Sequence, residues 1–118
     1  MARLTESQRE RFETFRRAFL AEVPARIAAI RKAATEAGRR GTSRAALEDL
    51  HHLVHQLVGA SAIFGLHALC GTARALEDLV TGLLEGAAPG AGELDRLTGA
   101  LERTWNETAT PRCRESKG

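Results

Sequence analysis

Aromatic residues are scarce in this sequence. Tyrosine is absent, and the 118 residues include only four phenylalanines and one tryptophan. A core drawn from this composition must consist mostly of leucine, alanine, valine and isoleucine, and the length is that of one domain that folds alone. No strand-like alternation of apolar and polar residues persists, and no repeat of 20–50 residues is visible. The composition therefore predicts a single all-α domain.

Cysteines and long apolar runs are also lacking. The two cysteines, Cys70 and Cys113, are too few for a disulfide framework and lack the close spacing of a thiolate metal site, which fits a reducing compartment. No window approaches the 18 apolar residues that a bilayer crossing requires, and no leader pattern opens the sequence. We therefore expect a cytoplasmic protein without membrane association, in which Cys70 is a small buried apolar residue.

The net charge of +2 conceals an asymmetry along the chain. Residues 1–44 contain eleven Lys and Arg against five Asp and Glu, whereas residues 45–118 contain six against ten. The arginines of the first part are spread around helices without aromatic stacking partners, so we expect no nucleic-acid partner. Solvated helix surface and attraction between the two parts of the molecule explain the pattern better.

A long first helical region is predicted from its cap and its apolar stripe. Thr5 and Gln8 have the spacing of a capping box. Pro24 lies within the stripe, and we expect either a kink or a short break near residues 20–24. The region should end near Ala37, with Gly38 as a left-handed cap. The stripe consists of Phe12, Phe15, Phe19, Val23, Ile27, Ile30 and Ala34.

A second helix is predicted after the basic loop at residues 38–41. Thr42 or Ser43 caps its first turn, and it should run to about Phe64, where Gly65 permits a positive φ angle. Its apolar side consists of Leu47, Leu50, Leu53, Val54, Leu57, Ser61 and Phe64.

Two further helices follow. The third should end by Gly86, the run GAAPGAG at residues 86–92 is a loop, and the last helix has Glu93 near its positive end. The third stripe is Leu69, Ala73, Leu76, Val80 and Leu83, and the fourth is Leu94, Leu97, Leu101 and either Thr104 or Trp105. Together the stripes predict an antiparallel four-helix bundle, with the first helical stretch as an additional or kinked N-terminal segment that could form a lid. We expect residues 1–108 to form the domain and residues 109–118 a disordered tail.

His55 lies on the side of the second helix opposite its apolar stripe, so we expect it to be exposed. Such a histidine can be mere surface decoration, but Gly59 lies one turn away, where glycine costs about 0.5–1 kcal/mol relative to alanine. That cost is understandable if a partner approaches closely. We therefore predict a docking surface around His55, with an apolar rim. Its expected members are His51, His52, Gln56, Val58, Gly59, Ala62 and Ile63.

A metal site is the competing chemical interpretation. His51 and His52 lie four and three residues before His55, and Glu48 lies a turn further back, which is a feasible partial zinc or nickel site. A convincing fourth ligand is missing, and His67 lies beyond the Gly65 cap. We expect no specific metal site.

The residues around His55 resemble the histidine-containing phosphotransfer (HPt) domains of multistep two-component signalling. His55-Gln56-Leu57-Val58-Gly59-Ala60-Ser61 follows that family's motif, Gly65 is the tenth residue after the histidine, and Leu69 and Leu76-Glu77 continue the pattern. The segment from Phe19 to Ile27 is similar to the helix and proline that members carry upstream. The resemblance covers roughly residues 12–105.

The resemblance implies that His55 accepts a phosphoryl group from an aspartyl phosphate on a response-regulator receiver domain and passes it to a second receiver. An imidazole is largely uncharged and nucleophilic at neutral pH, which suits this role. The chain would be a phosphoryl carrier rather than an enzyme, and its partners would be receiver domains or a hybrid sensor kinase. It would need no cofactor, because the Mg²⁺ would be held by the partner's acidic residues. We also expect a monomer.

The sequence departs from the family at Val58, where members usually have a lysine. Valine cannot balance the charge of a phosphate. Either another group takes that role, or the phosphorylated state is less stabilised, or the domain is a pseudo-HPt adaptor that binds a receiver or kinase without carrying phosphate. The other candidate groups are Arg31, Lys32, Arg74, Gln56 and His52.

Overall fold

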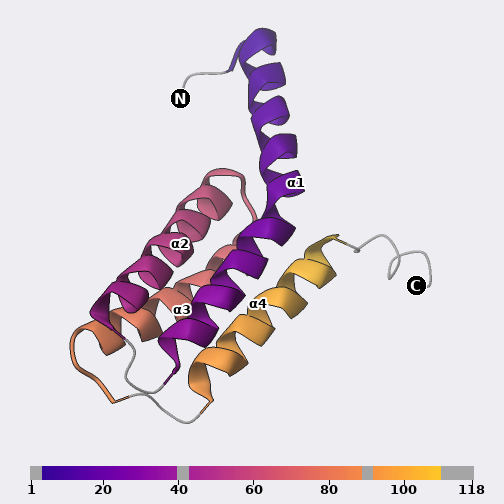
Figure 1. Ribbon diagram of the computed structural model, residues 1–118. Coiled ribbons are helices and arrows are strands. Elements are labelled where there is room, and N and C mark those ends of the chain that lie inside the picture. The colour runs from indigo at the N-terminus through magenta and orange to yellow at the C-terminus, as the bar shows by residue number, and fades with distance from the viewer. Residues whose placement is uncertain (1–3, 40–42, 89–91, 110–118) are drawn as a thin grey trace.

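Four helices account for almost all of the described chain. The computed structural model describes residues 4–39, 43–88 and 92–109, and no strand occurs within these ranges. The helices are α1 (Glu6–Ala37), α2 (Arg44–Ile63), α3 (His67–Leu84) and α4 (Glu93–Ala109) (Figure 1). Both α2 and α4 pack mainly on α1 and α3, so the four elements form a closed bundle. The predicted all-α four-helix bundle is confirmed.

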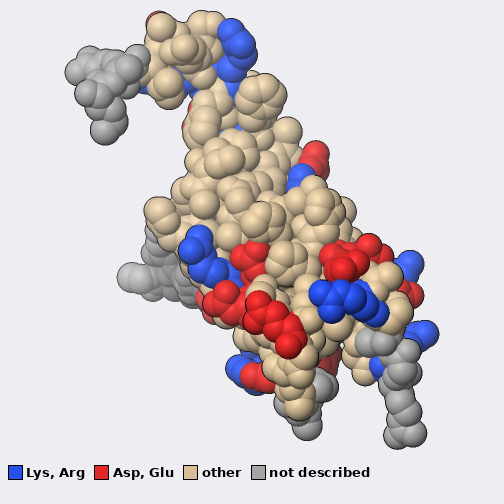
Figure 2. All heavy atoms as spheres, turned by 90° about the vertical axis from the view of Figure 1, so that its left-hand side faces the viewer, with Lys and Arg blue, Asp and Glu red and all other residues tan. Residues whose placement is uncertain are grey.

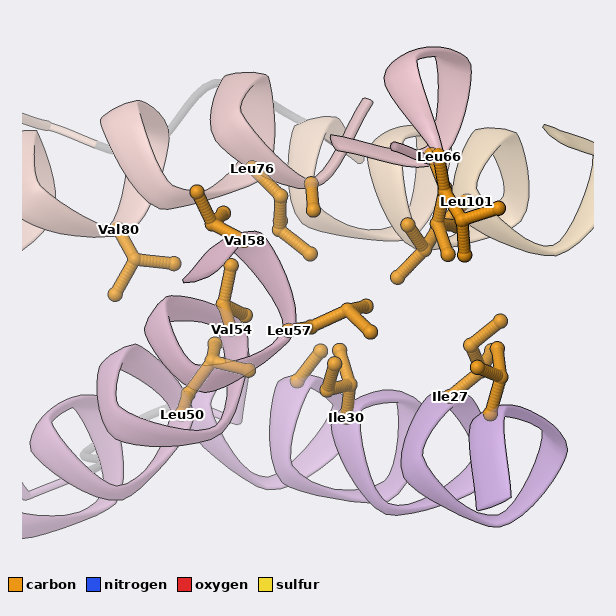
Figure 3. Packing of buried hydrophobic residues seen from close by; sticks show 14 of the residues in the cluster. Ile27, Ile30, Leu50, Val54, Leu57, Val58, Leu66, Leu76, Val80 and Leu101 are labelled. Atoms are coloured by element: carbon orange, nitrogen blue, oxygen red, sulfur yellow. The ribbon is translucent and has the colours of Figure 1, made fainter. Parts of the chain in front are cut away.

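The core lies along the bundle axis and receives one stripe from each helix. Residues that are fully or almost fully buried include Val23 and Ile30 of α1, Leu50, Val54 and Leu57 of α2, Leu69, Leu76 and Val80 of α3, and Leu101 of α4. Figure 3 shows how side chains of this cluster point inward between the helices. In the part of the chain that is described, no helix has the length and apolar character needed to cross a membrane.

A single helix, α1, replaces the two stretches expected around Pro24. Its start is the predicted capping box: the Gln8 backbone N–H donates to Thr5 Oγ1 at 3.0 Å, and the Thr5 N–H donates to Gln8 Oε1 at 2.9 Å. The short break considered near residues 20–24 is wrong, because the helix continues through these residues and Pro24 lies inside it. Val23 and Ile27 on either side are buried, and their packing offsets the missing backbone hydrogen bond.

The first turns of α1 extend beyond the other helices and do not form a lid over the bundle (Figure 1). All side chains from residue 4 to 15 are exposed, and Phe15 retains 63% of its accessible surface. The anchor of this segment is Phe64, whose ring centroid lies 5.3 Å from that of Phe12 and 5.4 Å from that of Phe19. Arg16 Nε also donates to the Phe64 carbonyl oxygen at 3.5 Å.

The helix ends follow the predicted caps with one exception. Gly38 has φ −84° and ψ −4°, so the predicted left-handed cap is wrong: the helical turn simply closes there, with the Gly38 N–H donating to the Ala34 carbonyl. Ser43 caps α2 by accepting a hydrogen bond from the Ala46 N–H at 3.2 Å, and the alternative, Thr42, lies outside the described residues. Gly65 has φ +74°, which confirms the positive angle predicted between α2 and α3.

The stripes of α3 and α4 are largely those predicted. Leu83, Leu94, Leu97 and Trp105 are only partly buried, and Thr104 accepts or donates a 2.9 Å hydrogen bond with Thr72. Thr98, absent from the predicted stripe, is 2% exposed and satisfies its hydroxyl on the Asp95 carbonyl. Cys70 is partly rather than fully buried, which corrects the expectation for it. Ala109, the first residue of the expected tail, belongs to α4; residues 110–118, with Cys113, lie outside the described part.

Candidate functional site

His55 and Glu77 form the centre of the site. His55 stands in the middle of α2 with 67% of its side-chain surface exposed, and Glu77 on α3 retains 17%. The two side chains are 22 residues apart in sequence, and His55 Nδ1 lies 2.5 Å from Glu77 Oε2. The antiparallel packing of α2 and α3 about the turn at Gly65 brings them together.

The contact with Glu77 determines which ring nitrogen of His55 is available for chemistry. An ionised carboxylate accepts hydrogen bonds and cannot donate them, so Nδ1 carries the proton in this contact. In the neutral ring the free lone pair is then on Nε2, at the other side of the imidazole. Because the ring is held by one edge and is otherwise largely exposed, Nε2 is an oriented and accessible nucleophile.

His51 adjoins this pair, whereas His52 does not. The His51 and His55 rings stack with centroids 5.9 Å apart and planes 9° from parallel. His51 Nε2 lies 3.9 Å from Glu77 Oε2, so the carboxylate lies beside both imidazoles. His52 instead lines a groove between α1 and α2, together with Lys32 and Asp49. The structure thus assigns only one of the two neighbouring histidines to the surroundings of His55.

Most of the predicted docking residues are exposed on α2. Gln56, Gly59, Ala62 and Ile63 are all exposed, and Ile63 retains 68% of its surface. A Cβ atom added at Gly59 would have no atom of this chain within 4 Å, apart from its own helical turn and neighbours. Internal packing therefore does not require glycine at this position, and the space above it is open to a partner.

Val58 was expected on the exposed face, and that expectation is wrong. Only 7% of its surface is accessible, and Figure 3 shows it among the core side chains. The reason is that α2 packs on both α1 and α3, so its buried side is wider than a single stripe. The Cys70 thiol of α3 lies 3.7 Å from the Val58 carbonyl oxygen, which fixes this part of α2 against α3.

The part of α2 that carries His55 has no fully charged side chain. Asp49 is the last Asp, Glu, Lys or Arg of α2, and the fourteen residues that follow it, up to Ile63, contain none. In Figure 2, which views the side of the molecule on the left of Figure 1, most charged side chains gather over the lower part, further Lys or Arg side chains lie at the upper end, and the surface between is largely uncharged. Any charge that the site offers to a phosphate must therefore come from a neighbouring helix.

A metal centre finds no support in the described ranges, 4–39, 43–88 and 92–109, where no group of three or more His, Cys, Asp or Glu side chains could hold a metal ion. His51, His55 and Glu77 do approach one another, but the His55 Nδ1 contact with Glu77 uses the carboxylate as a hydrogen-bond acceptor.

The role of Glu77 is the feature that sequence reasoning did not identify, although Glu77 was noted as part of a motif. A signal for it was present. Two antiparallel helices joined at Gly65 place residues at similar distances on either side of the turn next to each other, and His55 lies ten residues before it. Glu77 lies twelve residues after Gly65. It is thus within one helical turn of the position ten residues after Gly65, which would lie opposite His55.

The site is therefore a largely exposed histidine of a helical bundle, with its Nδ1 edge held by a carboxylate of the neighbouring helix. The family model of the Hpt domain matches residues 14–107, and the chain belongs to this family. Hpt domains have phosphotransfer roles in two-component phosphorelays, where they interact with receiver domains and kinases. Comparisons with curated proteins and with solved structures gave no significant match. The predicted family membership is confirmed.

Proposed function

We propose that this chain is a phosphorelay intermediate in which His55 accepts a phosphoryl group from a receiver-domain aspartate and passes it to another response-regulator receiver. The observation that carries the proposal is the 2.5 Å contact between Nδ1 of a largely exposed His55 ring and Glu77, which leaves Nε2 free for attack. Membership of the Hpt family supports the same reaction class.

In the proposed reaction the Nε2 lone pair attacks the phosphorus atom of the aspartyl phosphate. A P–N bond forms, the P–O bond to the aspartate breaks, and the aspartate leaves as a carboxylate. The proton on Nδ1 stays in place, and the carboxylate of Glu77 balances the positive charge that develops on the ring. The second receiver reverses these steps, since its own aspartate attacks the phosphorus and His55 is the leaving group.

The chain supplies the nucleophile in this reaction, and the partner supplies the rest. Phosphoryl transfer depends on in-line alignment and on neutralisation of charge, to which the partner's Mg²⁺ contributes. We therefore propose that the chain is a carrier and not an enzyme, that it needs no cofactor of its own, and that it works in the cytoplasm as a monomer with receiver domains or a hybrid sensor kinase. The small number of cysteines supports the compartment.

We further propose that the partner docks on the exposed residues of α2 that follow His55. Gln56, Gly59, Ala62 and Ile63 are exposed and uncharged, and they lie between one and eight residues after the histidine. Ile63 would bury apolar surface against the partner, and Gly59 would let the partner's loops come close to the helix backbone. His51 would lie at the border of this surface.

The decisive experiment is labelling by a phosphorylated receiver. Wild-type chain should acquire phosphate that is labile in acid and stable in base, as expected for phosphohistidine. His55→Gln should acquire none, and His52→Gln, an exposed histidine on the same helix but on the side of α1, should be labelled like wild type. Equal labelling of His55→Gln and wild type would refute the proposal.

The second candidate function is a pseudo-HPt adaptor, and the observation that favours it is the buried Val58 at the position of the family's usual lysine. An adaptor would bind a receiver or kinase without receiving phosphate. Calorimetric or biosensor binding that persists in His55→Ala, together with no detectable phosphate on wild type from any phosphorylated receiver, would identify the adaptor.

A further inference from the structure

A phosphohistidine at position 55 would place about two negative charges on a part of the α2 surface that has no Lys or Arg. The final fourteen residues of α2 contain no Lys or Arg, and Val58 points into the core. Gln56, His51 and His52 can donate hydrogen bonds, but in their neutral forms they cannot balance charge. A cation from a neighbouring helix is needed to stabilise the phosphoryl group as it arrives.

Arg74 on α3 is in the right place to be that cation. Cys70, Arg74 and Glu77 follow one another at spacings of four and three, so they share one face of α3. The two outer members of this row both touch α2: Cys70 Sγ lies 3.7 Å from the Val58 carbonyl oxygen, and Glu77 Oε2 lies 2.5 Å from His55 Nδ1. Arg74 lies between them on α3 and is therefore level with the part of α2 from His55 to Val58.

The position of the guanidinium agrees with this register. Arg74 Nη2 lies 3.8 Å from Cys70 Sγ, which itself lies 3.7 Å from the Val58 carbonyl oxygen. Two contacts thus connect the guanidinium to the backbone of the residue where the family usually has lysine. The side chain is exposed, and within the described ranges it has no ion pair with a carboxylate. Only a weak contact to sulfur must break for the guanidinium to turn toward His55.

Among the described residues, four other basic side chains near α2 are occupied or lie on another side. Arg31 pairs with Glu102 of α4, and Arg44 binds Glu48 and the Leu84 carbonyl oxygen at the far end of α2. Arg16 donates to the carbonyl of Phe64, nine residues or about two and a half turns beyond His55. Lys32 lines the groove on the α1 side of α2 with His52, whereas His55 faces α3.

We propose that Arg74 is the phosphoryl-binding residue of this domain and replaces, from the adjacent helix, the lysine that Val58 cannot provide. This inference rests on the proposed phosphorylation of His55. The guanidinium would form charge-assisted hydrogen bonds to phosphoryl oxygens on Nε2, while Glu77 holds Nδ1 on the other side of the ring. The site would then be built mainly by α3 around a nucleophile from α2.

The test uses phosphoramidate as a small-molecule phosphoryl donor, so no partner protein is needed. Nε2 of His55 attacks its phosphorus, a P–N bond to the ring forms, and the donor's own P–N bond breaks to release ammonia. The variants are Arg74→Gln, Arg74→Lys, Lys32→Gln and Arg96→Gln. Arg96 is an exposed arginine on α4, which packs mainly on α1 and α3, so its replacement is matched for loss of one positive charge.

We expect Arg74→Gln to be labelled roughly tenfold more slowly than wild type, the size of effect expected for loss of a charge-assisted hydrogen bond at an exposed site. Arg74→Lys should recover part of the rate, and Lys32→Gln and Arg96→Gln should match wild type. Thermal unfolding of all four variants should stay close to that of wild type, which separates this effect from a structural one. Equal rates for Arg74→Gln and Arg96→Gln, or a larger loss in Lys32→Gln, would overturn the inference.

A spectroscopic measurement tests the contact directly. In ¹⁵N-labelled protein, phosphorylation of wild type should shift the Arg74 Nε–Hε signal and leave that of Arg96 unchanged. An unshifted Arg74 signal on phosphorylated His55 would contradict the inference and leave the proposed function intact. If wild type and His55→Gln are labelled equally, it is the proposed function itself that fails.

Discussion

At the scale of single residues, Glu77 determines both the tautomer and the direction of the His55 ring. The ring is exposed over most of its surface, so no core packing fixes it, and the 2.5 Å contact at Nδ1 is the restraint that remains together with stacking on His51. An imidazole without such a restraint would turn about its side-chain bonds and place its proton on either nitrogen. The reactivity of Nε2 thus depends on a residue of another helix.

Replacement of Glu77 should therefore slow phosphorylation without unfolding the bundle. We expect Glu77→Ala to reduce the initial rate of labelling by phosphoramidate about tenfold, because the ring loses its orientation and its charge partner. Glu77→Gln should reduce this rate less, since the amide oxygen still accepts a hydrogen bond from Nδ1. Asp78→Ala, which removes a neighbouring exposed carboxylate, is the matched control and should label normally. A wild-type rate for Glu77→Ala would show that the contact does not orient the ring.

At the scale of elements, α2 combines two functions on opposite sides. Its buried side is wide because both α1 and α3 pack on it, and this width is what removes Val58 from the surface. Its exposed side keeps the uncharged residues after His55 and the open space above Gly59. A partner that fits this side meets a helix backbone uncovered at one point, one turn beyond the nucleophile.

Substitutions of Gly59 should change stability and docking in opposite directions. Gly59→Ala and Gly59→Trp both replace glycine in a helix interior where a Cβ has free space, so both should raise the free energy of unfolding, the alanine variant by about 0.5–1 kcal/mol. Transfer from a phosphorylated receiver should be nearly normal in Gly59→Ala and strongly reduced in Gly59→Trp, whose indole obstructs close approach. Denaturant unfolding and receiver-dependent labelling measure the two effects, and full transfer by Gly59→Trp would exclude close approach at this position.

At the scale of the whole molecule, the four helices form a packed bundle with a projecting N-terminal arm. The first turns of α1 extend beyond the other helices and rest on Phe64, at the same end of α2 as Ile63. The site itself is exposed, with His55 retaining 67% of its side-chain surface and open space above Gly59, which suits contact with a partner protein. We infer that the partner's metal, rather than one held by this chain, assists the reaction.

Removal of divalent metal should separate the two kinds of labelling. With a chelator present, transfer from a receiver aspartyl phosphate should stop, whereas labelling by phosphoramidate and the thermal midpoint of the isolated chain should not change. Magnesium added in excess should restore receiver-dependent transfer. A thermal midpoint that falls on chelation, with a stoichiometric metal that is lost in His51→Ala, would instead indicate a metal site in this chain.

The fold was predictable from the sequence because each helix carries its own signals. The capping box at Thr5, the stripe through Leu50, Val54 and Leu57, and the glycine at position 65 are all local features, and local hydrogen bonding and periodicity specify them. The exposure of His55 followed from the same periodicity, and its family motif indicated phosphotransfer. The pattern left a kink or a short break open near residues 20–24, and it could not exclude the break, because continuity of α1 depends on packing of Val23 and Ile27 against other helices.

Tertiary structure alone decided how the site is built. Which side chain holds the Nδ1 edge of His55, which neighbouring histidine joins it, and whether Val58 is exposed all depend on the rotation and register of α2 against α3. A stripe of apolar residues defines which side of a helix is buried, but it does not define how wide that side is or which helix covers each edge. The sequence by itself determined the nucleophile, and the packing of two helices determined the groups that act on it.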